Sequence, residues 1–296
     1  MAARAQVQFS IGRFVIFAVL AFAAIFYGAP LLWLFIAGTR SRDSLFTGTP
    51  YDLGDWASMV QTWINLSSYN SFELGQWALN SAIYAIGGVL VSLLTAIPAG
   101  YVLALYNFPG RRLILILTLI AIITPSAAIV LPIFLEMTLI GLNNTYAGLI
   151  LATGFFPFGV YLAYIYFASS MPAGIMDSGM IDGCNRFQLF LYLGLPLAGP
   201  LVALVAFFSF LANWSNYFLA LVLLSDERLF NLPVGLGALI DGAGALSNQQ
   251  GGSADIPIKL PEAIQACIVV VLPVLIIFLV SQRYVRAGLL SGAEKG

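Results

Sequence analysis

The side chains that most often perform chemistry in proteins are scarce in this sequence, and histidine is absent. The two cysteines are Cys184 and Cys267. Without histidine the chain cannot form a Ser-His-Asp triad, a histidine-ligated haem site or a Cys/His zinc site. It also lacks the phosphate-binding pattern G-x-x-x-x-G-K-[ST]. The sequence therefore predicts no catalytic centre, and no metal or cofactor bound by this chain.

Amide and aromatic side chains gather in one otherwise apolar stretch, at Asn213, Trp214, Asn216 and Tyr217. If the stretch is helical, the two amides share one face and the two rings an adjacent one. Amides at membrane depth are costly unless they bond across helices or line a wet path. Amides and rings also suit a sugar, through its hydroxyls and its C–H face. The sequence is compatible with two roles for these four residues, helix packing and the lining of a solute pathway.

A second segment, residues 169–198, has the residues of a docking helix. Pro172 can open a helix at its first turn, and Asp177 lies early in it, where the helix dipole favours an acid. Gly179 and Gly183 are four apart, so we expect them to share a face that a partner can approach closely. We assign seven further residues to the same surface: Met176, Ser178, Met180, Ile181, Asp182, Leu195 and Pro196. A helix resting on lipid headgroups is the alternative, but this segment lacks the Lys/Arg-rich face of that role.

The composition indicates that membrane-spanning helices position both segments. Hydrophobic residues make up 60% of the 296 residues, charged residues 8%, and the mean hydropathy is +0.95. A soluble protein needs roughly 25% charged residues. A hydrocarbon core about 30 Å thick needs roughly 20 apolar residues in a helix. The sequence predicts an all-α membrane protein with six transmembrane helices, at Phe14–Gly38, Trp77–Leu105, Leu113–Leu135, Tyr146–Ala168, Gly199–Leu224 and Ala263–Ser281.

The distribution of charge predicts the orientation of these helices. Six crossings put both termini on one side, and Lys and Arg favour the cytoplasmic side. With both termini cytoplasmic, the inner segments carry Arg4, Arg13, Arg111, Arg112, Arg186, Arg283, Arg286 and Lys295. The outer segments then carry most of the acids, and Glu136 is a solvated charge at the outer surface. Cys184 and Cys267 fall on opposite sides, so we expect no disulfide. The first span is too long for a cleaved signal peptide.

We divide the chain accordingly into residues 1–76, the first helix with an outer loop; 77–285, a transmembrane core; and 286–296, a cytoplasmic tail. The core contains the inner loop 169–198 and an outer loop, 225–262, that is rich in glycine and flexible in composition. Small residues recur every four positions at Gly88, Ser92, Ala96 and Gly100, a pattern that lets helices pack closely. Prolines that can kink their helices are Pro98, Pro125, Pro132 and Pro273.

The inner loop resembles the coupling-loop signature of bacterial ABC-importer permeases, E-A-A, three residues, G, nine residues, I-x-L-P. Here it reads Asp177-Ser178-Gly179, then Gly183, then Leu193-Gly194-Leu195-Pro196. Both spacings match, and the three departures replace acid by acid or small by small. The chain is most similar to the second permease of maltose-type carbohydrate importers. Asn80-Ser81 and the tail ending Gly288-x-x-x-Gly292-x-x-Lys295-Gly296 also resemble that subclass.

This resemblance implies a MetI-like permease fold in the bacterial cytoplasmic membrane and an assembly. The expected partners are a second permease, two cytoplasmic ATPase subunits that hold ATP and Mg²⁺, an extracytoplasmic solute-binding protein, and a carbohydrate. No nucleic acid is expected. The implied mechanism is alternating access, with the coupling helix moving with the ATPases. In such permeases the outer loop before the last helix can enter the binding protein, so the 236–254 region is either that device or a plain flexible insertion.

Two other classes remain as alternatives. A stand-alone secondary transporter or channel would want an intramembrane acid or base, or an internal repeat. The predicted spans carry no charge in their interiors. A membrane-embedded enzyme would have to work without histidine and without an intramembrane pair of acids, which leaves isolated Ser, Tyr or Asn side chains.

Overall fold

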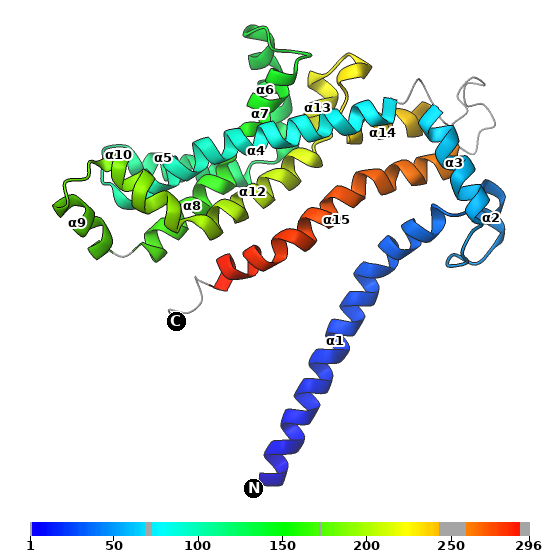
Figure 1. Ribbon diagram of the computed structural model, residues 1–296, viewed down its shortest axis with the longest axis horizontal. Coiled ribbons are helices and arrows are strands. Elements are labelled where there is room, and N and C mark those ends of the chain that lie inside the picture. The colour runs from blue at the N-terminus through cyan, green and yellow to red at the C-terminus, as the bar shows by residue number, and fades with distance from the viewer. Residues whose placement is uncertain (1, 69–72, 172, 243–258, 291–296) are drawn as a thin grey trace. The chain divides into compact units, whose positions relative to one another are not determined.

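The computed structural model describes residues 2–68, 73–171, 173–242 and 259–290, and all regular structure in these ranges is helical (Figure 1). Pro172, most of the glycine-rich outer loop and the end of the tail therefore lie outside the described residues. The chain divides into two compact units. One comprises Met1–Phe72 and Ala238–Val269, and the other comprises Glu73–Gly237 and Val270–Gly296.

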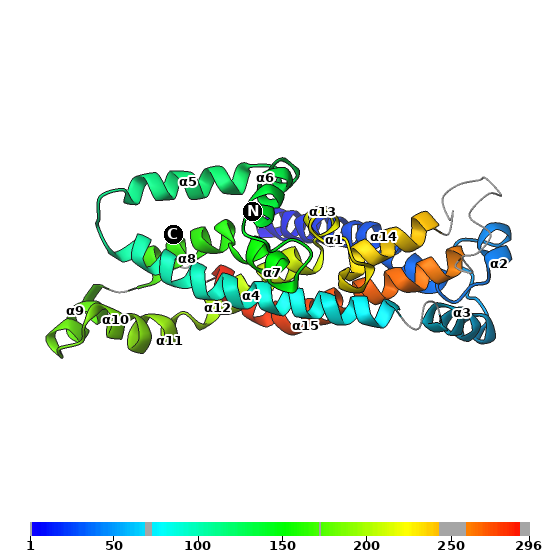
Figure 2. The same cartoon turned by 90° about the horizontal axis from the view of Figure 1, so that it is seen from above.

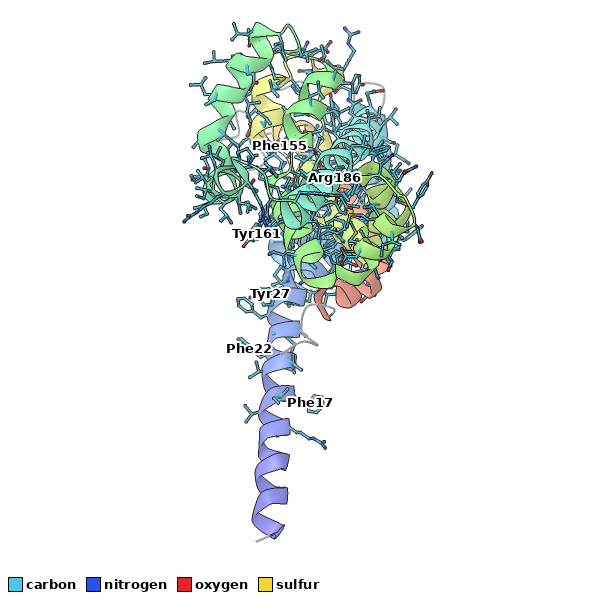
Figure 3. The ribbon with its side chains drawn as sticks, turned by 90° about the vertical axis from the view of Figure 1, so that its left-hand side faces the viewer. Phe17, Phe22, Tyr27, Phe155, Tyr161 and Arg186 are labelled. Carbon is cyan, nitrogen blue, oxygen red and sulfur yellow. The ribbon has the colours of Figure 1, made fainter. Side chains whose placement is uncertain are left out.

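The first unit contains α1 (Ala2–Ala37), α2 (Arg42–Thr47), α3 (Trp56–Ser68) and the beginning of α15 (Leu260–Leu290). Figure 3 shows Phe17, Phe22 and Tyr27 projecting from α1, and each is about 70% exposed. Such a surface is stable only in lipid or against another protein. Buried Gln265 donates to the Gly38 carbonyl at 2.9 Å and to the Met59 carbonyl at 3.0 Å, and so links α15 to the segment after α1 and to α3.

The second unit is built around α4 (Glu73–Leu105), which packs against α7 (Tyr146–Gly154), α8 (Pro157–Ser170) and α12 (Gly199–Trp214) (Figures 1 and 2). The stripe of small residues makes these contacts. A Cβ on Gly88 would overlap the Asn213 amide, and one on Gly100 would overlap Ala163. Ser92 donates to the Gly154 carbonyl and accepts from Ser209, both at 2.8 Å. The predicted packing role of the stripe is confirmed.

The two ends of α4 hold different parts of the chain. Near its beginning, buried Asn80 donates to the carbonyls of Arg228 and Phe230 at 2.8 and 2.9 Å, beside η3 (Glu227–Leu229). The end of α4 leads to Tyr106, whose ring lies 5.0 Å from the Arg186 guanidinium of the inner loop. A helix of 33 residues is about 50 Å long, more than a bilayer core requires. The 227–231 segment and the inner loop therefore lie at opposite ends of a membrane-length helix.

The apolar helices match the predicted spans in part. Within the part of the chain that the structure describes, four stretches are long and apolar enough to cross a membrane: Gly12–Ala37, Glu73–Leu105, Tyr146–Ser170 and Leu260–Gln282. Two bent pairs raise this to six if each pair forms one span. These pairs join Arg111–Ile123 to Ser126–Leu139 at 110°, and Arg186–Leu197 to Gly199–Trp214 at 77°.

Three predicted spans are wrong as continuous helices. The fourth is interrupted between α7 (Tyr146–Gly154) and α8 (Pro157–Ser170). The third breaks between α5 (Arg111–Ile123) and α6 (Ser126–Leu139), because Pro125 forces the preceding Thr124 into an extended conformation, with ψ 125°. The fifth ends at Trp214 and resumes as α13 (Phe218–Leu223). Pro98, Pro132 and Pro273 instead lie inside α4, α6 and α15.

Candidate functional site

The inner loop begins with α9 (Ala173–Ile181), whose end is fixed by Gly183. The Gly183 N–H donates to the Met180 carbonyl at 3.1 Å, and the Cys184 N–H donates to the Gly179 carbonyl at 3.0 Å. This is a Schellman motif, and it requires the left-handed conformation that Gly183 adopts, with φ +84°. The expectation that Gly183 shares a helical face with Gly179 is therefore wrong, because Gly183 lies beyond the end of the helix.

Gly179 is buried and faces the chain's own next segment. A Cβ at this position would lie 2.5 Å from a Leu189 methyl and 2.9 Å from a Leu193 methyl. The small residue thus lets α9 approach α10 (Arg186–Leu189) and the π-helix η2 (Phe190–Gly194). We predicted that a partner protein would contact this face of α9. In the structure, Leu189 and Leu193 of the chain itself cover it.

The outward face of α9 is apolar and flanked by acids. Ile181 is 85% exposed and Met180 54% exposed, and Asp177 and Asp182 are also exposed. Met176, which we expected on this surface, instead lies partly buried, with its sulfur 3.9 Å from the Tyr101 hydroxyl. The exposed knob of α9 therefore consists of Met180 and Ile181 at the end of the helix, with Ser178 exposed on α9 as well.

A second cap holds the other side of the turn. The Asn185 side chain accepts from the Gln188 N–H at 2.9 Å, and the Gln188 side chain accepts from the Asn185 N–H at 2.8 Å. This capping box opens α10 and follows the Schellman motif within two residues. The segment ends at α11 (Leu195–Leu197), where Leu195 and Pro196 are exposed. Two caps at adjacent positions fix the turn between α9 and α10.

A cavity of about 460 Å³ lies elsewhere in the second unit, where three helices are interrupted. It adjoins the beginning of α6, the end of α7 and the break between α12 and α13. Irregular backbone at membrane depth is stable only where protein buries it or where it lines a water-filled cavity. The polar lining residues are all uncharged: Ser126, Thr153, Asn213, Ser215, Asn216 and Tyr217.

The four amide and aromatic residues predicted to form a site do not act together. Asn216 and Tyr217 line the cavity after the helix has ended, and the Tyr217 hydroxyl has no hydrogen-bond partner among the described residues. Asn213 also borders the cavity, but its amide lies against Gly88 and donates to the Ser209 carbonyl at 2.8 Å. Trp214 stacks on Phe210 and donates to the Val270 carbonyl at 2.9 Å.

Sequence reasoning missed Ser126 and Thr153, because they are far from residues 213–217 along the chain. The signal in the sequence that could have located these two residues was proline. Pro125 and Pro157 each interrupt an apolar run, and the helix ends they create border the cavity at Ser126 and Thr153.

A bundle of membrane-length helices, several of them broken around a cavity with uncharged polar groups, is typical of membrane transport proteins. The chain belongs to the family of binding-protein-dependent transport system inner membrane components, whose profile matches residues 96–290. It is therefore a multi-pass protein of the cytoplasmic membrane and a transport subunit, not a catalytic enzyme.

Curated relatives of the chain have sugar-transport names. It is 32% identical over 283 residues to the arabinooligosaccharides transport system permease protein of Halalkalibacterium halodurans, covering 95% of this chain and 94% of that one. It is 29% identical to the diacetylchitobiose uptake system permease protein of Streptomyces coelicolor, covering 89% and 82%. It is 27% identical to the trehalose/maltose transport system permease protein of Thermococcus litoralis, covering 90% and 91%.

A solved structure has the same fold. A chain in the crystal structure of a bacterial ABC transporter involved in the import of the acidic polysaccharide alginate superposes with a TM-score of 0.76 and 24% sequence identity. The match covers 95% of this chain and 98% of that one. The expected MetI-like permease fold is confirmed.

Proposed function

We propose that the chain is one of two permease subunits of an ATP-driven carbohydrate importer. It would pair with a second permease and receive solute from an extracytoplasmic binding protein. Two cytoplasmic ATPases would bind ATP and Mg²⁺. Six spans, with α5 and α6 counted as one and α12 as another, would place both termini in the cytoplasm, as the positive-inside rule favours. The names of the curated relatives support the carbohydrate class.

The exposed knob of α9 is the observation that carries this proposal. Met180 and Ile181 place two exposed apolar side chains next to each other at the end of a doubly capped projection. Helices bind in grooves through apolar anchors of this kind. Because the projection lies at one end of the membrane-length helix α4, a partner in solution can reach it. We assign Met180 and Ile181 as the contact with the ATPase, with Asp177, Ser178 and Asp182 at its rim.

In this proposal Gly183 supports transport because its left-handed backbone conformation ends α9. An L-residue with a Cβ in the left-handed region costs roughly 1–2 kcal/mol, whereas Asn tolerates it better. We expect Gly183→Ala and Gly183→Leu to reduce transport by a similar factor of roughly 5 to 30, because no atom lies within 4 Å of the added Cβ. Gly183→Asn should retain most transport. Uptake by reconstituted vesicles is the measurement, and an Asn variant as impaired as the Leu variant would instead show that the partner touches residue 183.

The cavity at the helix breaks is proposed as part of the solute pathway. Its uncharged hydroxyl and amide groups can bond sugar hydroxyls, and its apolar walls, such as Ile129 and Phe218, can contact the C–H faces of a ring. Asn216 and Tyr217 are the side chains proposed to meet solute. Asn213 and Trp214, which we also expected on the pathway, have contacts that support holding α12 against its neighbours.

Tyr217→Phe tests this assignment with the removal of one hydroxyl. Losing one solute hydrogen bond costs about 0.5–1.5 kcal/mol, so we expect uptake efficiency to fall roughly 2- to 10-fold with unchanged thermal stability. Arabinotriose, diacetylchitobiose and trehalose are the probes, since relatives are named for these classes of solute. Tyr161→Phe is the matched control, because Tyr161 does not line the cavity. Equal uptake by the two variants would remove Tyr217 from the pathway.

The proposal as a whole is tested by purifying the chain from its native membrane in mild detergent. We expect an ATPase and a second permease to co-purify and to be identified by mass spectrometry. Transport of the same three sugars by the chain alone, in vesicles without ATP, would instead favour a self-sufficient transporter or channel.

A further inference from the structure

Tyr101 lies near the end of α4, is 2% exposed, and contacts both α9 and η2 of the coupling segment. Its hydroxyl lies 3.9 Å from the Met176 sulfur of α9, and its ring centroid lies 5.0 Å from that of Phe190 in η2. The ring also meets Phe167 of α8 edge-on at 5.2 Å. One side chain of the transmembrane bundle thus contacts both the docking helix and the helix that follows it.

Because residue 194 is a glycine, the coupling segment can approach the Tyr101 ring closely. A Cβ on Gly194 would lie 2.9 Å from the Tyr101 ring, nearer than real Cβ contacts occur. Gly194 is buried, and its ordinary negative φ, −62°, requires no glycine. The reason for a glycine here is therefore the approach of the Tyr101 ring.

The rest of the coupling segment is not packed against α4. A cavity of about 530 Å³ lies beside these contacts and is lined on the loop side by Arg186, Phe187 and Phe190. On the α4 side it is lined by Pro98, Tyr101, Val102, Tyr106, Asn107 and Phe108. The segment is therefore held at Tyr101, and by Arg186 over the Tyr106 ring, with free space beside these contacts.

The backbone at this point is also adapted for movement. Pro196 has no N–H, so the α-helical bond to the Tyr192 carbonyl cannot form, and the turn widens into the π-helix η2, in which the Leu195 N–H donates to the Phe190 carbonyl. π-Turns are frequent at functional sites. The chain then bends by 77° into α12, which leads to the proposed solute cavity.

We propose that Tyr101 is the pivot on which the coupling segment turns, so that movement of α9 is transmitted through η2 to α12. Tyr101 is a positioning residue in this role, since it touches neither solute nor ATPase. The inference rests on the proposed function, because it assumes that an ATPase moves α9. It adds Tyr101 as the residue at which the movement of α9 is converted into movement of the membrane-spanning helices.

The test uses the complete importer in vesicles and measures three quantities: ATPase affinity, thermal stability and ATP hydrolysed per sugar transported. We expect Gly194→Ala, which presses one methyl group on the Tyr101 ring, to raise the ATP-to-sugar ratio at least about fivefold. ATPase affinity should stay within about twofold. Gly199→Ala is the matched control, because no atom lies within 4 Å of its added Cβ. Tyr101→Phe, which keeps the ring, should stay coupled, and Tyr101→Leu should not.

Each result separates this inference from the proposed function. A normal ATP-to-sugar ratio in Gly194→Ala overturns the pivot, even if Tyr101→Leu fails to fold. Equal loss of ATPase affinity and coupling in either variant also overturns it, because Tyr101 would then only support the docking surface. A wild-type chain that binds no ATPase would contradict the proposed function itself.

Discussion

Ile181→Asp should abolish ATP-driven uptake while the permease remains folded. The side chain is 85% exposed, so a carboxylate there meets water in the free subunit and costs little stability. In the complex the same carboxylate would be buried against an apolar groove. Loss of an interface anchor costs about 2–4 kcal/mol, which corresponds to a roughly 30- to 700-fold weaker complex. Titrating the solubilised permease pair with purified ATPase measures this change.

Leu139→Asp is the matched control for this substitution. Leu139 is 87% exposed and ends α6 in the connection that the predicted topology places outside the cell. The same carboxylate there should leave ATPase affinity within about twofold. Undiminished affinity in Ile181→Asp would show that the partner binds elsewhere, and equal losses in both variants would point to a general defect of folding.

Gly100→Ala should prevent most of the protein from folding, although it adds a single methyl group. The added Cβ would overlap the Ala163 Cβ and lie 2.7 Å from backbone atoms of Ala163 and Tyr164 in α8. Backbone cannot rotate away, so α4 and α8 must separate along a buried interface. Overpacking typically costs 1–3 kcal/mol, and we expect at least about 3 kcal/mol here. Thermal unfolding of the purified chain in detergent, with its yield, measures the effect.

Gly87→Ala on the same helix provides the comparison. The nearest atom to that added Cβ is the end of the flexible Ile150 side chain, at 2.7 Å, and a rotamer change can move it. We expect a loss of about 1 kcal/mol or less. If the two variants unfold at the same temperature, the backbone contact between α4 and α8 is looser than the structure indicates.

The helical class and the packing stripe were predictable because they depend on local pattern. Charges are so rare that they mark where apolar runs end, and glycines or serines four apart define a helix face at any position. The stripe along α4 depends on that spacing alone. Asn80 and Ser81 were noticed only through the family resemblance. The structure shows their physical role: Ser81 accepts from the Leu232 N–H at 2.7 Å, and Asn80 donates to the carbonyls of Arg228 and Phe230 just before it.

The errors arose where conformation depends on residues distant in sequence. Spacing places Gly179 and Gly183 on one face only if the helix continues, and a left-handed Gly183 ends it. The direction of Gly179 depends on Leu189 and Leu193, which return after a turn. Likewise, Asn213 and Asn216 share a face only in an unbroken helix, and α12 stops at Trp214. The cavity brings together three helix breaks, which no single segment reveals.

The central claim is that the 173–197 segment lies in the cytoplasm and seats in an ATP-hydrolysing partner. A thiol-anchored photo-crosslinker on Ile181→Cys, in a chain carrying Cys184→Ser and Cys267→Ser, tests it in native membranes. We predict a crosslinked product with an ATPase subunit, and no labelling of Cys at 181 by a membrane-impermeant thiol reagent in intact cells. Labelling from outside, with no ATPase adduct, would contradict the account.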